Sequence, residues 1–166
     1  MRVKGTRALN QALTKAFKPF GGYKFQLSDC FEVCWHSKII HFTVENRIED
    51  EWFYEFIKKT FGFETEHGFL LSILHEIGHI KTYDFLPSEI TNFDEDESER
   101  ISKQMQNANA DESKALNFEY FNLINELSAT KWAVRYMRNN PEEIEKLASA
   151  VYDTLYEFYR KNGVIE

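Results

Sequence analysis

The chain has 166 residues and a net charge of −7, and 43% of its residues are hydrophobic, which is enough for one domain with a substantial core. No apolar run approaches about 18 residues, so the sequence excludes a transmembrane helix and we expect no membrane partner. The first residues lack the apolar stretch of a signal peptide, so we expect a cytoplasmic protein.

The first 24 residues hold six bases and no acid, a charge pattern that could contact nucleic acid. Within them, Leu9, Leu13 and Phe17 recur at helical spacing, which predicts a helix that Thr6 caps and Pro19 ends. The bases are then the solvated face of this helix. We favour that interpretation, although the bases leave nucleic-acid binding open.

Three stretches with alternating polar and apolar residues follow, and they predict strands at 23–27, 31–35 and 39–45. A tight turn at Ser37-Lys38 would join the second strand to the third. We therefore predict a small antiparallel sheet of about three strands. Cys30 and Cys34 would lie about 13 Å apart along a strand, too far for a mutual disulfide.

A helix capped by Asp50 and ended by Gly62 is expected next. The following helix, which runs to about Lys81, contains the sequence His75-Glu76-Ile77-Gly78-His79 within an otherwise aliphatic run. Histidines four residues apart project from one helix face and can ligate one zinc ion, while the glutamate acts as general base toward a zinc-bound water.

The same pattern on a surface helix could bind no metal at all. Here the aliphatic residues of this helix would bury it, and buried imidazoles and carboxylates need partners; they are Leu70, Ile73, Leu74, Ile77 and Ile80. Gly78, inside the helix, marks a close approach of another element or a functional need. We therefore expect zinc at His75 and His79, with Glu76 as the catalytic base.

An acidic insertion follows at about 83–112, with nine acids and two bases. Its sparse apolar residues predict either a mobile excursion or a loop containing one solvated helix around Glu95 to Gln106. Because a connection of this length is usually functional or disordered, it could be a lid over a cleft or a merely solvated insertion. The sequence leaves both open.

A helix over about 115–139 would supply the third protein ligand that two histidines and a water leave missing. We choose Glu126, since Leu123, Ala129 and Ala133 share its helix face and the small residues would let this helix approach the histidine helix. The alternative makes Glu126 a surface acid. A last helix, with Asn140 as cap and Pro141 at its first position, would end at Asn162-Gly163 and support the core.

The His-Glu-Ile-Gly-His spelling, followed 47 residues after His79 by Glu126-Leu127-Ser128-Ala129, resembles zincin metallopeptidases with a glutamate as third ligand. Within that superfamily it is similar to the ImmA/IrrE-type peptidases of bacteria, phages and mobile elements. SprT-like peptidases usually take a histidine as third ligand, and no histidine follows His79 here. The resemblance covers about a third of the chain. The long acidic insertion and the lack of a clear helix-turn-helix depart from the family pattern.

This resemblance implies an α+β, zincin-like fold in one domain over residues 1–166, with the small sheet packed on a mostly helical body around the His-Glu-x-x-His helix. It also implies zinc as cofactor, His75, His79 and Glu126 as ligands and Glu76 as catalytic base. Some family members cleave a repressor protein. The substrate would then be a protein or peptide, which by family expectation lies extended along an edge of the sheet.

The leading hypothesis is thus a zinc-dependent endopeptidase that acts on an intracellular protein. A tetrahedral oxyanion would need a further donor, for which Tyr83, Tyr120 and Tyr136 are candidates by position. The alternative is a zinc-containing regulatory or inhibitory protein of phage or mobile-element type, which engages a basic partner through the acidic insertion. The substrate and the oligomeric state cannot be inferred from the sequence.

Overall fold

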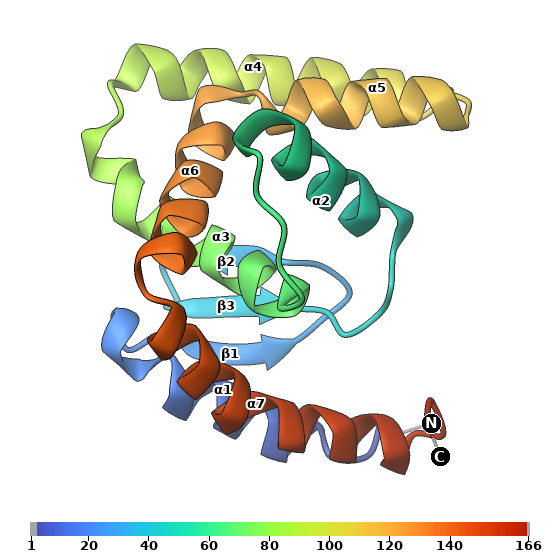
Figure 1. Cartoon of the computed structure of the whole chain (residues 1–166). Helices are drawn as coiled ribbons and strands as arrows, with labels where there is room; N and C mark the ends of the chain where they lie inside the picture. Colours follow the sequence, from blue (N-terminus) through green and yellow to red (C-terminus); the bar gives the residue numbers. More distant parts are fainter. Residues whose placement is uncertain (1–2, 166) are drawn as a thin grey trace. The chain divides into compact units, whose positions relative to one another are not determined.

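The computed structural model describes residues 3–165, and within this range the chain forms seven α-helices and one three-stranded sheet (Figure 1). The mostly helical α+β class predicted from the sequence is confirmed. By their contacts the residues group into two compact units: the chain up to Glu45 together with the chain from Met137 onward, and Asn46–Tyr136. That residues 1–166 form a single domain stays a prediction.

The first unit contains the sheet. Its elements are α1 (Thr6–Ala16), the 3₁₀ helix η1 (Lys18–Phe20), β1 (Lys24–Leu27), β2 (Glu32–Cys34), β3 (Ile39–Phe42) and α7 (Pro141–Lys161). The strand order is β1-β3-β2, in which β2 pairs antiparallel with β3 but β1 pairs parallel with β3. The prediction of an antiparallel sheet is therefore wrong, and the sheet is mixed. Successive strands reverse direction, so β1 and β3 run the same way and become parallel when they are neighbours.

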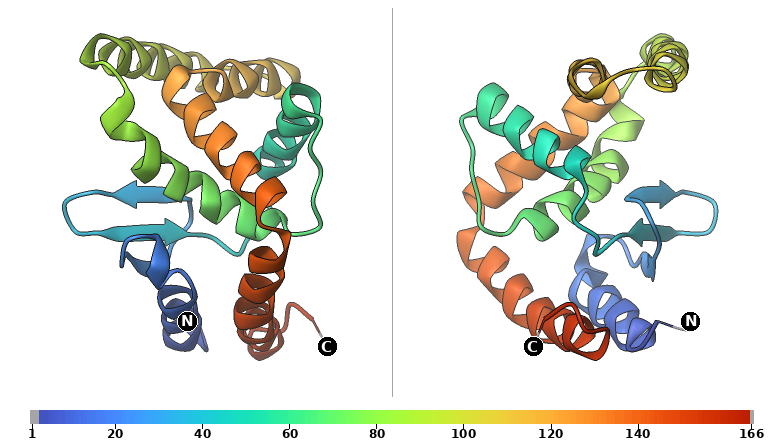
Figure 2. Two further views of the ribbon diagram at one scale, coloured as in Figure 1. Left: turned by 60° about the vertical axis from the view of Figure 1, so that its left-hand side comes forward. Right: turned by 90° about the vertical axis from the view of Figure 1, so that its right-hand side faces the viewer.

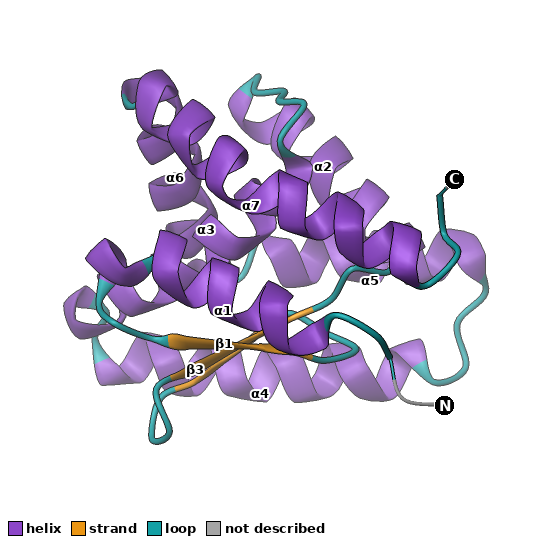
Figure 3. Ribbon diagram, turned by 90° about the horizontal axis from the view of Figure 1, so that it is seen from below, coloured by secondary structure: helices purple, strands orange, loops and turns teal. Residues whose placement is uncertain are grey.

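Helix α1 covers the outer edge of β1. Thr14 Oγ1 accepts a hydrogen bond from the backbone N–H of Phe25, and Asn10 Oδ1 accepts one from that of Leu27, both at 3.0 Å. These bonds satisfy strand groups that would otherwise be unpaired. Helices α1 and α7 lie side by side (Figure 3). Arg7 and Lys15 of α1 are exposed, as expected for a solvated face, whereas Arg2 lies outside the described residues.

The ends of α1, α2 (Ile48–Phe61) and α7 differ in detail from the sequence expectations. Gly5 rather than Thr6 is the N-cap of α1, and its positive φ of 84° suits glycine. The next helix begins two residues before Asp50, whose carboxylate pairs with Arg47 instead of capping. Asn140 and Pro141 begin α7 as predicted, but without a side-chain hydrogen bond at the cap.

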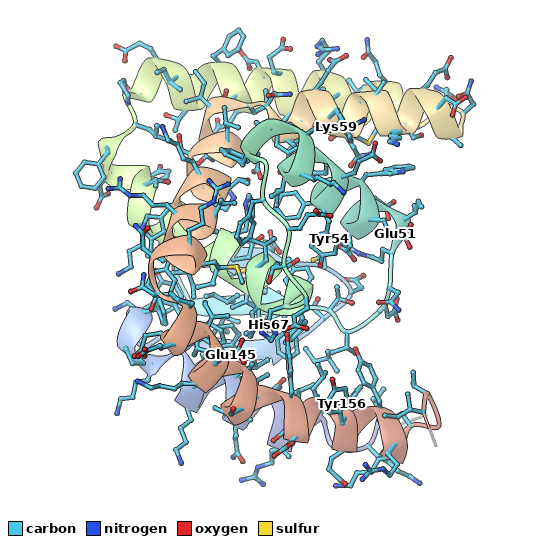
Figure 4. The ribbon with its side chains drawn as sticks, viewed as in Figure 1. Glu51, Tyr54, Lys59, His67, Glu145 and Tyr156 are labelled. Atoms are coloured by element: carbon cyan, nitrogen blue, oxygen red, sulfur yellow. The ribbon has the colours of Figure 1, made fainter. Side chains whose placement is uncertain are left out.

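The second unit is helical. Its elements are α2 (Ile48–Phe61), α3 (Gly68–Thr82), the 3₁₀ helix η2 (Tyr83–Phe85), α4 (Ser88–Met105), α5 (Ala110–Phe121) and α6 (Ile124–Asn139), of which the residues from Met137 count with the first unit. Gly62 ends α2 with φ 58°, as predicted. Tyr54 of α2, labelled in Figure 4, packs its ring against Gly68 at the start of α3 and bonds Ser72 Oγ at 3.1 Å.

The acidic insertion is helical over most of its length. Helix α4 is longer than the solvated helix expected around Glu95 to Gln106, and it runs antiparallel beside α5, as Figures 1 and 2 show. Ile101 of α4 joins Leu116 and Leu123 in a buried apolar cluster. A capping box of Asn109 and Glu112 begins α5. The segment is thus packed structure, and whether it acts as a lid stays open.

The single helix expected over about 115–139 is instead two helices, α5 and α6, with a break at Asn122 and Leu123. Leu123 is buried in the cluster with Ile101 and Leu116. The break places Tyr120, near the end of α5, against Glu126 in the first turn of α6. The end of α5 and the start of α6 therefore both contribute to the surroundings of Glu126.

Candidate metal centre

Helix α3 is buried over most of its length. The nine consecutive residues Leu70–Gly78 are buried, and they include His75 and Glu76, each only 7% exposed. His79, one turn later, keeps 12% of its side chain exposed. His67 lies at the N-cap, two turns before His75 (Figure 4). Imidazoles and carboxylates that are removed from water need polar partners. The contacts of these side chains therefore indicate whether they form a binding site.

Gly78 lets α3 and α6 approach each other closely. A Cβ on Gly78 would lie 2.4 Å from the carbonyl oxygen of Ala129 and 2.9 Å from its Cα, closer than nonbonded atoms can come. Ala129 is fully buried. The prediction that this glycine marks a close approach is confirmed, and the neighbour is the helix that carries Glu126.

Glu126 faces both histidines. Its Oε2 lies 3.0 Å from His75 Nε2, its Oε1 lies 3.4 Å from His79 Nε2, and the two Nε2 atoms are 3.1 Å apart. The side chain of Glu126 is 13% exposed. The structure therefore brings together the three residues that the sequence predicts as ligands, and as a group they could hold a metal ion.

Each histidine is held through its other ring nitrogen. His75 Nδ1 lies 3.0 Å from Thr130 Oγ1, and the Thr130 hydroxyl itself donates to the backbone carbonyl of Glu126 at 2.9 Å. Because that hydroxyl hydrogen is used, Oγ1 accepts from His75 Nδ1–H, and the His75 Nε2 keeps its lone pair. His79 Nδ1 lies 3.2 Å from Oδ1 of Asn125, an acceptor, so the same argument leaves a lone pair on His79 Nε2.

Two imidazole lone pairs and a carboxylate consequently face one another. Such acceptors repel unless a cation, either a proton or a metal ion, lies among them. Zinc binds nitrogen and oxygen at about 2.0–2.1 Å in tetrahedral geometry, which requires ligand atoms about 3.3 Å apart. The two Nε2 atoms are 3.1 Å apart, and each lies 3.0 or 3.4 Å from one of the two Glu126 oxygens, so the three residues are close enough to share an ion of this kind.

The same contacts shift the pKa values of two of these groups. Burial by itself lowers the pKa of His79, but the hydrogen bond and charge of Glu126 outweigh burial and raise this pKa to about 9. Burial by itself raises the pKa of Glu126, whereas the contacts with His75 and His79 hold it well below its usual range. Glu126 is therefore ionised at neutral pH, the form that ligates a metal, while His79 must release a proton to do so.

Glu76 lies within electrostatic reach of this site. Its carboxylate is buried, and its charge contributes to the raised pKa values of both His79 and Tyr120. Phe53 of α2 packs edge-on against the His75 ring, with ring centroids 5.1 Å apart. The site thus combines a carboxylate beside the histidines with an apolar wall that excludes water.

The three tyrosines lie in different surroundings. The Tyr120 hydroxyl donates to Glu126 Oε1 at 2.9 Å, and burial together with the charge of Glu126 raises the Tyr120 pKa far above its usual range. Tyr83 lies half-exposed at the start of η2. Tyr136, which lies ten residues after Glu126, stacks on Trp132. Tyr120 is therefore a partner of a predicted ligand, and the identity of an oxyanion donor among the three stays a prediction.

Sequence reasoning missed Thr130 and Asn125, which hold the two histidines. Thr130 lies four residues after Glu126 and so shares its helix face, a position at which a hydroxyl could have been recognised as a partner of the same site. Asn125 immediately precedes Glu126 and carries no comparable periodic signal.

No protein-family model, no curated protein and no solved structure matches the chain. The resemblance to zincins therefore stays a prediction from the sequence motif, and the structure adds the candidate metal group of His75, His79 and Glu126. Among residues 3–165, none of the helices combines the length and the apolar character needed to cross a bilayer.

Proposed function

We propose that the protein is a zinc-dependent endopeptidase that hydrolyses a peptide bond in an intracellular protein, with a regulator or repressor as the leading substrate class. The observation that carries the proposal is the convergence of His75 Nε2, His79 Nε2 and the Glu126 carboxylate in a buried site within reach of Glu76. Two imidazoles, one carboxylate and a neighbouring glutamate are the ingredients of hydrolytic zinc sites.

The donor set favours zinc over other common ions. Calcium and magnesium prefer oxygen ligands, whereas two of the three donors here are imidazole nitrogens. Iron, copper and nickel also accept imidazole, so the choice of zinc rests additionally on the His-Glu-x-x-His spacing, the pattern of hydrolytic zinc sites.

Each side chain then has a role. A bound zinc ion would supply Lewis-acid chemistry, polarising the scissile carbonyl and acidifying water. Glu76 would accept a proton from the attacking water on its carboxylate and deliver it to the leaving amine nitrogen. Thr130 and Asn125 would keep the two imidazoles in the ligating tautomer, and Tyr120 would hold the Glu126 carboxylate through its hydroxyl.

The test compares wild type with Glu76→Gln, which keeps the size of the side chain but cannot accept the proton. Both purified, zinc-loaded proteins are incubated with a library of proteome-derived peptides, and new termini are identified by mass spectrometry. We expect new termini with wild type and a loss of at least about 100-fold in rate with Glu76→Gln at unchanged zinc content. Glu66→Gln, whose side chain is 86% exposed, is the matched control. Equal cleavage by wild type and Glu76→Gln would refute the proposal.

One observation favours the second function, a regulatory or inhibitory protein that engages a basic partner. The acids of α4 are mostly exposed, among them Glu95 and Asp96. Deleting this helix would expose Ile101, so the cleaner variant is Glu95→Lys with Asp96→Lys. A cellular effect that survives Glu76→Gln and is lost in the double lysine variant would replace the peptidase proposal by this one.

A further inference from the structure

Asp94 is the one buried acid of helix α4. It is 5% exposed, while the other acids between residues 83 and 112 are exposed or half-exposed. It lies seven residues before Ile101, on the helix face that packs inward. A buried carboxylate on that face calls for an explanation, because removing a charge from water is unfavourable unless it gains partners.

The partner of Asp94 is the start of α6. Its Oδ2 accepts a hydrogen bond from the backbone N–H of Asn125 at 2.6 Å. The first N–H groups of a helix have no partner within the helix, and a carboxylate there is favoured by the helix dipole. Leu123, which precedes α6, has no side-chain oxygen to cap it. Asp94 therefore caps α6 from a different helix.

The residue held in this way is the one that bonds His79. The backbone N–H of Asn125 is bound by Asp94, and its side-chain Oδ1 accepts from His79 Nδ1–H at 3.2 Å. His75, in contrast, bonds Thr130, which lies beyond the first turn of α6 and whose hydroxyl is fixed by the Glu126 carbonyl. The partner of His79 thus sits at the end of the helix, where the backbone frays most easily without a cap.

We propose that Asp94 is a positioning residue of the metal centre: it fixes the first turn of α6 so that Asn125 holds the His79 ring in the tautomer that presents Nε2 to the metal. This inference rests on the proposed metal centre and is independent of peptidase activity. The acidic insertion then contributes a fixed support to the site.

Packing alone does not account for Asp94. Its Oδ1 is buried and has no hydrogen-bond partner among the described residues. An apolar side chain of similar size would fill the same place between helices without leaving an unsatisfied oxygen. The one contact that an apolar residue could not make is the bond to Asn125.

The test measures zinc affinity at pH 7.5 by competition with a chromophoric chelator. Removing the acceptor in Asp94→Leu, which keeps the volume, or in Asp94→Ala should weaken zinc binding about 10-fold or more, as loss of a partner that orients a ligand does. Asp94→Asn retains an oxygen acceptor and should stay within about 3-fold of wild type. Asp96→Ala, an exposed acid of the same helix, is the matched control and should bind as wild type does.

A double-mutant cycle separates positioning from general structure. Asn125→Ala removes the amide that bonds His79 but keeps the backbone N–H, so combining it with Asp94→Leu should weaken zinc binding no further than Asn125→Ala alone. Independent, multiplying effects would overturn the proposal. So would wild-type zinc affinity in Asp94→Leu.

A second readout needs no metal. In the chelated protein, at a pH high enough for the His79 ring to be neutral, ¹⁵N NMR should report the tautomer with its hydrogen on Nδ1 in wild type and in Asp94→Asn, and a mixture of the two tautomers in Asp94→Leu. An unchanged His79 spectrum in Asp94→Leu would overturn the positioning role of Asp94, whether or not wild type binds zinc. Absence of zinc binding in wild type would instead refute the proposed function.

Discussion

Helices α3 and α4 both carry polar and acidic residues, but in opposite settings. In α3 nine consecutive residues are buried, and two of the three polar ones among them, Ser72 and His75, each contact a partner on another helix. In α4 most acids are exposed, and two of them pair with bases of the same helix, Glu97 with Arg100 and Glu99 with Lys103. Such exposed pairs contribute little to stability. Burial, rather than charge or the number of acidic residues, therefore distinguishes the polar residues around the candidate metal centre from those of the surface.

The largest effect of a single substitution is expected at Gly78 of α3. In Gly78→Ala the new methyl group would meet the Ala129 carbonyl at 2.4 Å, and a backbone atom cannot rotate away. We expect the free energy of unfolding to fall by about 2 kcal/mol or more, even after a gain of about 1 kcal/mol in helix propensity. Denaturant unfolding measures this, with the exposed Lys81→Ala as control. Wild-type stability in Gly78→Ala would contradict the close contact of α3 with α6.

The next effect is expected where a residue on α6 holds a residue on α3. Thr130→Val keeps the shape of the side chain but removes the hydroxyl that accepts from His75 Nδ1–H. Zinc affinity should fall by about 10- to 100-fold, whereas Thr130→Ser should retain most of it. Equal affinities of the two variants in a chelator competition would show that the hydroxyl does not orient His75.

The raised pKa of His79 predicts a pH dependence of zinc binding. Glu126 raises the His79 pKa to about 9, so below that pH a proton competes with the metal for Nε2. Affinity should rise with pH, by about tenfold per unit between pH 7 and pH 9 for each proton released, and then level off. With an unperturbed histidine pKa of about 6.5 the rise would already end near pH 7. Titrations at several pH values distinguish the two profiles.

The smallest effect is expected on the exposed face of α4. Asp96→Asn removes a charge that is solvated in the folded chain, so the melting temperature should change by no more than about 2 °C and zinc affinity should stay as in wild type. A clear loss of either property would mean that the exposed acids of α4 matter to the fold or the site, and the contrast with α3 would fail.

The sequence predicts those features of the candidate site that depend on the spacing of residues along a single helix. His75, Glu76 and His79 follow from spacing, and the aliphatic residues around them predict the burial that is observed. Glu126 was found because small residues share its helix face, and Ala129 does contact Gly78. Local periodicity is sufficient for such features, since it depends only on helix geometry.

The parts that were missed depend on which elements become neighbours. Strand alternation gives directions but not order, so the parallel pairing of β1 with β3 could not be read from it. The break at Asn122 and Leu123 carries neither proline nor glycine, the usual signals for a helix end. The burial of Asp94 is not predicted, because eight other acids surround it in the sequence between residues 83 and 112. Only its spacing of seven residues to Ile101 indicates the inward face of the helix.

In the proposed site, His75, His79 and Glu126 together bind one zinc ion. Elemental analysis of protein purified without added metal, or reloaded with zinc and desalted, tests it most directly. We predict about one zinc per chain in wild type, a small fraction of that in Glu126→Ala, and wild-type content in Glu119→Ala, an exposed glutamate of α5 that pairs with Arg100. Full zinc content in Glu126→Ala, or none in wild type, would contradict the account.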